Sequence, residues 1–197
     1  ISYEISGVAG VEFTAVFIDM IKGYDLASRT LTEKLCRHGL ELPEALCRMI
    51  EELYMETAMV EVGLDGTEDV SPTKRGVFQG CPISPKLYDW QMTYATRSWH
   101  ESGEDWEQQG IPMKAYTPGG VFDVVLKERF YCDDGSVYEL DRARAFRVAT
   151  SLCNHITRIT GWMPSVGEKG KTEFSHLGRR SQEPVAPQEV CGSVVHY

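Results

Sequence analysis

Hydrophobic residues in positions 11–20 (VEFTAVFIDM) form a short apolar run rich in aromatic and β-branched side chains. This composition and length favour a β-strand over a helix. Because side chains alternate between the two faces of a strand, Phe13, Ala15 and Phe17 share a face with Asp19, which ends the run. A carboxylate among apolar neighbours is costly unless it is paired, hydrogen-bonded or bound to a cation. Asp19 is therefore a candidate functional residue.

Two stretches near the amino terminus have apolar residues at helical spacing, 26–38 and 44–54. Gly39 suits the carboxyl-terminal cap of the first, and Pro43 suits the first position of the second. The second helix is expected to bury Leu46, Met49, Ile50 and Leu53.

Two longer helices are predicted further along the chain. One begins at Ser84-Pro85, a cap followed by a first-turn proline. The other spans about 140–160 and ends at Gly161. The expected buried positions are Leu87, Trp90, Tyr94 and Ala95 in the first, and Leu140, Phe146, Ala149, Cys153, Ile156 and Ile159 in the second.

The remaining regular patterns indicate strands. Residues 58–70 predict a hairpin that turns at Asp65-Gly66, and 119–126 predict another strand. Residues 130–138 (FYCDDGSVY) predict a second hairpin, because Asp-Asp-Gly-Ser is typical of turns and Gly135 tolerates a positive φ. On these residues alone, an ordinary surface hairpin with an acidic tip remains open.

This order of elements predicts an α+β fold in which helices pack on one face of an antiparallel sheet. Residues 1–178 are expected to form the domain. Residues 179–197 carry few helix signals and are expected to be a loosely structured tail.

Composition restricts the class of protein. The chain has 197 residues, of which 42% are hydrophobic and 25% charged, as in ordinary globular domains. The sequence has no apolar run of about 18 residues that could span a membrane, and no signal peptide is recognisable. We therefore expect an intracellular protein of the nucleus or cytoplasm that is not secreted. Its six cysteines are widely spaced without a Cys-x-x-Cys pair, which favours reduced thiols over zinc ligands.

The net charge of −9 argues against a generic nucleic-acid-coating protein, which is normally basic. The charge is unevenly distributed, however. Arginines cluster between residues 142 and 158, while acidic residues cluster between 101 and 107.

Asp19, Asp133 and Asp134 suggest a common site, because adjacent central strands would bring the strand end and the hairpin tip together. Clustered carboxylates supply the hard oxygen ligands that Mg²⁺ prefers, with waters and substrate phosphates completing its octahedron. Two such ions about 4 Å apart can activate an attacking hydroxyl and stabilise the leaving oxygen of a phosphoryl displacement.

Four segments in order, 17–25 (FIDMIKGYD), 75–85 (RGVFQGCPISP), 130–138 (FYCDDGSVY) and 170–174 (GKTEF), resemble the palm motifs of reverse transcriptases. The resemblance runs from about residue 11 to 175 and is to the non-long-terminal-repeat retrotransposon and group II intron type. It implies a polymerase palm with the palm-proximal part of the fingers, acting as a nucleotidyltransferase. It also implies two Mg²⁺ ions, for which Mn²⁺ substitutes, and as partners an RNA template, a DNA primer and deoxynucleoside triphosphates.

The resemblance also assigns roles to individual residues. Asp19 and Asp133 match the main metal ligands, and Asp134 is the second acid of the pair. Tyr24 matches the ring that excludes a ribose 2′-hydroxyl. Lys171 matches a lysine near the leaving pyrophosphate. The positions matched to nucleotide and template binding are Arg75, Gln79 and Gly80.

Each assignment has a simpler structural alternative. Tyr24 can cap a core, Gln79 can brace its own loop, and Lys171 can be a solvated surface lysine. The sequence also departs from the family pattern, since Cys132 stands where alanine is usual and the charged residues 127–129 precede the catalytic pair.

The resemblance leads us to expect that further fingers strands precede residue 1 and that a thumb follows residue 197. A catalytically inert domain of the same fold, used as a nucleic-acid or protein-binding scaffold, is the alternative function. A calcium loop at 132–141 lacks the acid spacing of an EF-hand.

Overall fold

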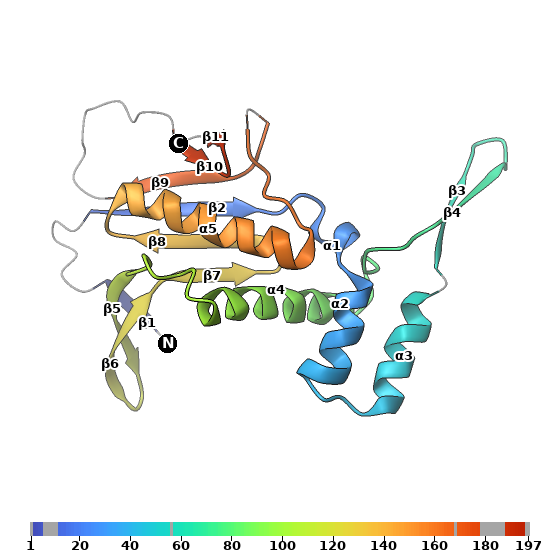
Figure 1. Ribbon diagram of the computed structural model, residues 1–197, viewed down its shortest axis with the longest axis horizontal. Coiled ribbons are helices and arrows are strands. Elements are labelled where there is room, and N and C mark those ends of the chain that lie inside the picture. Colours follow the sequence, from blue (N-terminus) through green and yellow to red (C-terminus); the bar gives the residue numbers. More distant parts are fainter. Residues whose placement is uncertain (1, 6–11, 56, 168, 178–187, 196–197) are drawn as a thin grey trace.

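A computed structural model of the chain describes residues 2–5, 12–55, 57–167, 169–177 and 188–195. Its centre is a four-stranded antiparallel sheet in the order β7-β8-β2-β9 (Figure 1). The strands are β2 (Phe13–Asp19), β7 (Glu128–Tyr131), β8 (Asp134–Glu139) and β9 (Glu173–Leu177). The predicted α+β class and the predicted strand near 11–20 are confirmed, within the part of that range that the structure describes.

One face of this sheet carries helices α4 (Ser84–Glu101) and α5 (Arg142–Thr160). Val16 and Ile18 of β2 point to this face and are fully buried in the main hydrophobic core, which includes residues of both helices. The opposite face carries Phe17, whose side chain is 43% exposed, and Asp19. The prediction that Asp19 shares a face with Phe17 is correct, but this is the more open face of the strand.

Both long helices start close to the predicted residues, and α5 also ends where predicted. In α5 the Asp141 side chain accepts a hydrogen bond from the Arg144 N–H, and Gly161 ends the helix with a φ of 79°. In α4 the helix already includes Ser84, so Ile83 and not Ser84 occupies the cap position.

The predicted buried positions of α4 and α5 are partly correct. Leu87 and Ala95 are buried in α4, whereas Tyr94 is 43% exposed, and Leu140 lies before α5 and is 40% exposed. The stripe that α4 buries consists of Ser84, Leu87, Tyr88, Gln91, Met92, Ala95 and Trp99.

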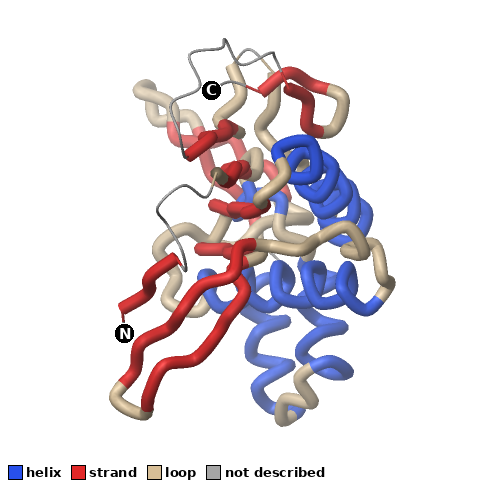
Figure 2. The backbone as a smooth tube through the Cα atoms, turned by 90° about the vertical axis from the view of Figure 1, so that its left-hand side faces the viewer, coloured by secondary structure: helices blue, strands red, loops and turns tan. Residues whose placement is uncertain are grey.

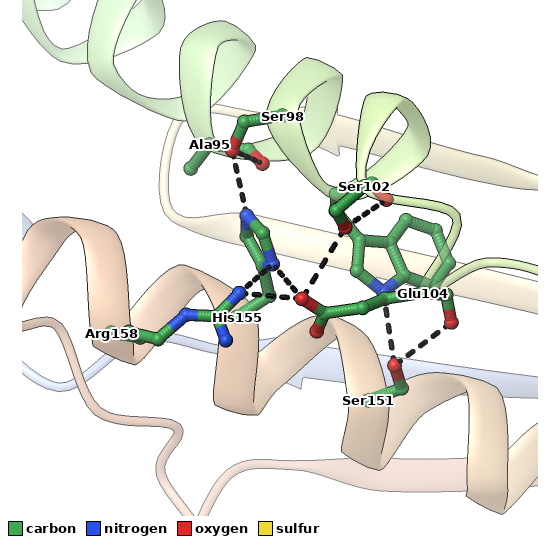
Figure 3. Close-up of polar contacts among 8 residues, drawn as sticks. Ala95, Ser98, Ser102, Glu104, Ser151, His155 and Arg158 are labelled. Carbon is green, nitrogen blue, oxygen red and sulfur yellow. Dashed lines mark hydrogen bonds and ion pairs between the residues drawn. The ribbon is translucent and has the colours of Figure 1, made fainter.

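A network of polar contacts holds α4 and α5 together (Figure 3). The His155 ring lies 2.6 Å from Ser98 Oγ through Nε2 and 3.1 Å from Glu104 Oε1 through Nδ1. This order of groups resembles a nucleophile, a base and an orienting acid. The Ser98 hydroxyl also contacts the Ala95 carbonyl of its own helix at 3.1 Å, and His155 is buried between the two helices with only 3% of its surface exposed. We therefore assign the network a structural role.

The segment after β2 contains helices that pack beside α4. They are α1 (Gly23–Leu26), α2 (Arg29–Lys34) with a π-helical turn (Leu35–Gly39), and α3 (Glu44–Met55). The helix predicted for 26–38 therefore begins later, at a cap where Ser28 Oγ accepts from the Leu31 N–H. Of the four positions predicted as buried in α3, Ile50 is buried, but Met49 and Leu53 are 51% and 40% exposed.

Two hairpins extend from this body. The predicted hairpin at 58–70 is observed as β3 (Ala58–Val62) and β4 (Glu68–Pro72), which project into solvent (Figure 1). The second consists of β5 (Ile111–Thr117) and β6 (Gly120–Leu126), joined by β1 (Ser2–Ile5) in a three-stranded sheet. Figure 2 shows this sheet extending away from the four-stranded one. Strand β6 was predicted, whereas β5 was not.

The last described residues form a small hairpin of β10 (Gln188–Val190) and β11 (Ser193–Val195). Val190 and Val195 are buried, and the Cys191 N–H donates to Thr150 Oγ1 of α5 at 3.3 Å. This part of the predicted tail is therefore regular structure on α5, while 178–187 lie outside the described residues. None of the helices described is long and apolar enough to cross a membrane, and the six cysteines are free thiols.

Candidate active site

Three carboxylates meet at one end of the two central strands. Asp19 ends β2 and Asp134 begins β8, and their Cα atoms are direct partners in the antiparallel register. Asp133 lies in the turn between β7 and β8, where Tyr131 pairs with Asp134. The structure thus brings together the three acids that the sequence suggested, from positions more than a hundred residues apart.

The turn that presents Asp133 is made differently from the prediction. Cys132, not Gly135, adopts the positive φ, at 53°. Gly135 lies in β8, where a Cβ atom would sit only 2.5 Å from Cε1 of the Phe130 ring. Glycine is therefore needed there for close packing and not for the turn.

The charged residues before this turn lie at the edge of the sheet. Strand β7 has only β8 as a neighbour, and Glu128 accepts from His100 Nε2 at 2.8 Å and from Gln108 Nε2 at 2.6 Å. Charges at an edge are compatible with a sheet, so the unusual residues 127–129 do not prevent the hairpin from docking on β2.

Electrostatics at this end of the sheet disfavour ionisation of Asp19. Burial raises the pKa of its carboxyl, and the nearby Asp133 and Asp134 raise it further. Lys171 acts in the opposite direction, with its Nζ atom 3.9 Å from Asp19 Oδ1. The net result is a raised pKa, so the ionised site holds excess negative charge that a cation would neutralise.

The carboxylates at this strand end have the donor chemistry that Mg²⁺ prefers. Among the described residues, however, no group of three His, Cys, Asp or Glu side chains is arranged to hold a metal ion. Mg²⁺ is usually bound through one or two carboxylates, with water and substrate phosphates supplying the rest. Asp19, Asp133 and Asp134 supply such oxygens at one strand end, where Asp134 is exposed and the other two are partly buried.

Lys171 lies beside these carboxylates on the segment that leads into β9. Its backbone N–H donates to Ser165 Oγ at 3.1 Å, and Thr172 Oγ1 accepts from the Asp19 N–H at 3.4 Å. The Lys171 side chain is 78% exposed. The segment is therefore anchored to β2 while the ammonium group remains accessible to a ligand.

Tyr24 lies on the short helix α1 that follows β2. Its ring stacks on Tyr88 of α4 with centroids 5.0 Å apart and an angle of 4°, and its hydroxyl donates to Cys132 Sγ at 3.7 Å. Burial raises the pKa of Tyr24 to about 12, with the bond to Cys132 as the next cause. The phenol is therefore neutral at physiological pH and lies next to the turn that carries Asp133.

The loop before α4 is held by Arg29. Its guanidinium donates to the backbone carbonyls of Tyr54, Thr73, Arg75 and Gly76 at 2.6–3.1 Å. Gly76 has a φ of 90°, and a Cβ there would lie 2.8 Å from the Asp25 carbonyl oxygen. These contacts fix the loop against the segment that carries Tyr24.

The same loop carries Arg75, Gln79 and Gly80, the residues predicted to bind nucleotide and template. Gln79 Nε2 donates to Asp25 Oδ1 at 3.4 Å, one residue from Tyr24. Gly80 has a φ of 84° and open space around it, and Arg75 lies exposed beside Gly161, at the end of α5. The contacts described here do not connect Arg75, Gln79 or Gly80 to the carboxylates.

Sequence reasoning missed two residues behind the site, Tyr88 and Trp162. Both are fully buried, and their rings stack with centroids 4.3 Å apart. Helical spacing placed Leu87 in the core but could not show that its neighbour Tyr88 reaches Tyr24. The small residue Gly23 was the only local signal, since a Cβ there would lie 2.6 Å from the Tyr88 hydroxyl.

Comparisons with known proteins give a fold relationship. No protein-family model matches the chain, and no curated protein does. Among solved structures, apo telomerase from Candida tropicalis truncated from its C-terminal domain matches with a TM-score of 0.56 and 15% identity, over 87% of this chain. Telomerase from Candida albicans with a fragment of telomeric RNA matches with a TM-score of 0.54 and 14% identity, over 92% of this chain.

A third match is telomerase from Candida tropicalis with the same kind of RNA fragment, at a TM-score of 0.56 and 11% identity over 96% of this chain. This chain spans 32%, 29% and 30% of the lengths of these three proteins. The comparison does not distinguish types of reverse transcriptase, so the resemblance to the non-long-terminal-repeat and group II type stays a prediction. The chain shares its α+β fold with the matched part of these telomerases.

Proposed function

We propose that the chain is the palm of an RNA-directed DNA polymerase, including the palm-proximal part of the fingers. The observation that carries the proposal is the register of β2 and β8, which sets Asp19 opposite Asp134 with Asp133 in the adjoining turn. The telomerase-like fold supports it, since telomerase is itself a reverse transcriptase. In this proposal a primer 3′-hydroxyl attacks the α-phosphate of a deoxynucleoside triphosphate.

Asp19 and Asp133, with Asp134 beside them, would hold two Mg²⁺ ions or Mn²⁺ in their place. Bound there, the ions would activate the attacking hydroxyl and stabilise the leaving oxygen. The raised pKa of Asp19 fits this role, because its carboxyl is partly buried beside two further acids and Lys171 offsets these effects only in part.

The remaining residues would orient the substrates. Lys171 is close enough to Asp19, and exposed enough, to place a positive charge beside the departing pyrophosphate. The Tyr24 ring would lie under the incoming sugar and exclude a 2′-hydroxyl. Gln79 and Gly80 would approach the nucleotide and the template base from the braced loop, with Arg75 at its start.

The proposed partners are an RNA template and a DNA primer. Two of the matching telomerases were solved with a fragment of telomeric RNA. Recognition of RNA and DNA strands by this chain is part of the proposal.

Primer extension on an RNA template tests this function. We expect the wild-type chain to incorporate deoxynucleotides with Mg²⁺ or Mn²⁺, and Asp133→Asn to abolish incorporation. Asp65→Asn, which removes an exposed carboxylate of the β3–β4 hairpin, is the matched control and should retain activity. Binding of template and primer without incorporation, unaffected by Asp133→Asn, would instead indicate an inert scaffold.

A further inference from the structure

Three aromatic rings form a continuous stack behind the proposed site. Tyr24 of α1 stacks on Tyr88 of α4 at 5.0 Å, and Tyr88 stacks on Trp162 at 4.3 Å, with interplanar angles of 4° and 13°. Trp162 follows Gly161, so the stack joins three segments that are far apart in the sequence. We call these three residues the aromatic column.

The inner rings are held in place by packing alone. Tyr88 and Trp162 are fully buried, and neither the Tyr88 hydroxyl nor the Trp162 Nε1 has a hydrogen-bond partner among the described residues. Leaving a buried polar atom unpaired costs free energy. Leucine would fill the space without that cost but would offer no flat surface for stacking, so the aromatic rings are used here for stacking.

The outer ring is also held at its hydroxyl. Tyr24 Oη donates to Cys132 Sγ at 3.7 Å, and Cys132 is the residue with the positive φ that immediately precedes Asp133. Alanine, the residue usual in the resembled motif, offers no acceptor at this position. The ring of Tyr24 is thus fixed on its face by Tyr88 and at its tip by the turn that carries a proposed metal ligand.

Gly23 makes this close packing possible. It immediately precedes Tyr24, and a Cβ atom at residue 23 would lie only 2.6 Å from the Tyr88 hydroxyl. A side chain at residue 23 would push Tyr88 away from Tyr24 and separate the rings.

From this geometry we propose that Tyr88, Trp162 and Cys132 are positioning residues that fix the ring of Tyr24 and so determine the discrimination between deoxyribose and ribose. This inference rests on the proposed function. A ring can exclude one hydroxyl sterically only if the ring itself is held in place. A displacement of a positioning group by about 1 Å can change rates by about a hundredfold.

Two measurements test the proposal, one of which needs no activity. The first is the NMR ring-proton shifts of Tyr24, assigned by comparison with Tyr24→Phe, which report its stacking on Tyr88. The second is the ratio of kcat/KM for deoxynucleotides to that for ribonucleotides. The test variants are Trp162→Leu, Cys132→Ala and Trp162→Phe, and the matched control is Trp99→Leu. Trp99 is an equally buried tryptophan of α4 that lies outside the column and donates to Ser151 Oγ.

We expect Trp162→Leu and Cys132→Ala each to shift the Tyr24 ring signals and to lower the sugar discrimination about tenfold or more. Trp162→Phe should restore both, and Trp99→Leu should change neither. Equal effects of Trp162→Leu and Trp99→Leu, or unchanged Tyr24 signals in both Trp162→Leu and Cys132→Ala, would overturn the proposal. If the wild-type chain incorporates no nucleotide, the proposed function fails, while the ring signals still decide whether the column fixes Tyr24. If Trp162→Leu does not fold, Cys132→Ala decides alone.

Discussion

Replacing Asp19 by asparagine should make the metal-free protein more stable. The Asp19 side chain is 17% exposed and faces Asp133 and Asp134, and its pKa is raised above the usual 3.8 because burial outweighs the attraction of Lys171. That attraction is weak, since Lys171 is 78% exposed and such pairs contribute at most about 1 kcal/mol. Removing the charge should therefore raise the free energy of unfolding by about 1 kcal/mol, or about 2–4 °C in melting temperature for a chain of this size.

The pH dependence gives the sign of the effect. Because folding raises the pKa of Asp19, its carboxyl favours the folded state only when protonated, below the unfolded value of 3.8, and this contribution is lost as the pH rises through the folded pKa. The gain from Asp19→Asn should be complete at neutral pH and should disappear below the unfolded value. Thermal melts in a chelator at several pH values measure it.

Added Mg²⁺ should reverse the order of stability. Binding at ten times the dissociation constant stabilises the wild-type protein by about 1.4 kcal/mol, whereas Asp19→Asn should gain little. Lys171→Met removes the ammonium group beside the acids and should therefore destabilise the metal-free protein. A loss of stability in Asp19→Asn at neutral pH, or a gain that persists unchanged in acid, would refute this view of the site.

Three further predictions follow from single contacts. Gly135→Ala should destabilise by about 1–3 kcal/mol, because its Cβ would lie 2.5 Å from the Phe130 ring; a melt within the error of wild type would show that the ring moves freely. Arg29→Met removes a charged donor from four backbone carbonyls and should cost about 2–4 kcal/mol in urea unfolding. A much smaller cost would mean that water replaces the guanidinium. The pKa of His100 is raised because hydrogen bonds to two carboxylates outweigh the lowering effect of burial. The protonated ring should therefore stabilise the folded protein below pH 6.5, and this contribution should be lost as the pH rises through the folded pKa. A pH–stability profile that is unchanged by His100→Gln would contradict this.

Local sequence patterns predicted the elements that depend on local physics. Helix α5 has a clear helical period, an Asp141 cap and a terminal Gly161, and it was predicted nearly to its ends. The hairpin with Asp133 was likewise predicted from its turn residues. Strand β5 was missed although Ile111, Met113 and Ala115 alternate on its buried face, because Pro112 interrupts the pattern and a polar stretch precedes it.

The features that depend on tertiary contacts could not be predicted. The residue with positive φ in the acidic turn is Cys132, because the register of β7 and β8 pairs Tyr131 with Asp134 and so places the turn at 132–133. The same register sets Gly135 opposite Phe130, where only glycine fits. The stacking of Tyr24 and Tyr88 likewise requires α1 and α4 to meet. The proximity of the acids was predicted because Asp19 ends an apolar strand and Asp133-Asp134 lie at a hairpin tip, which adjacent central strands bring together.

We propose that Asp19, Asp133 and Asp134 form one site for divalent metal ions. Titration of Mn²⁺, followed by electron paramagnetic resonance in the presence of primer, template and deoxynucleotide, tests it directly. We expect saturable Mn²⁺ uptake by the wild-type chain and by the control Asp65→Asn, and loss of that uptake in Asp19→Asn. Equal uptake in the wild type and Asp19→Asn, or none in the wild type, would contradict it.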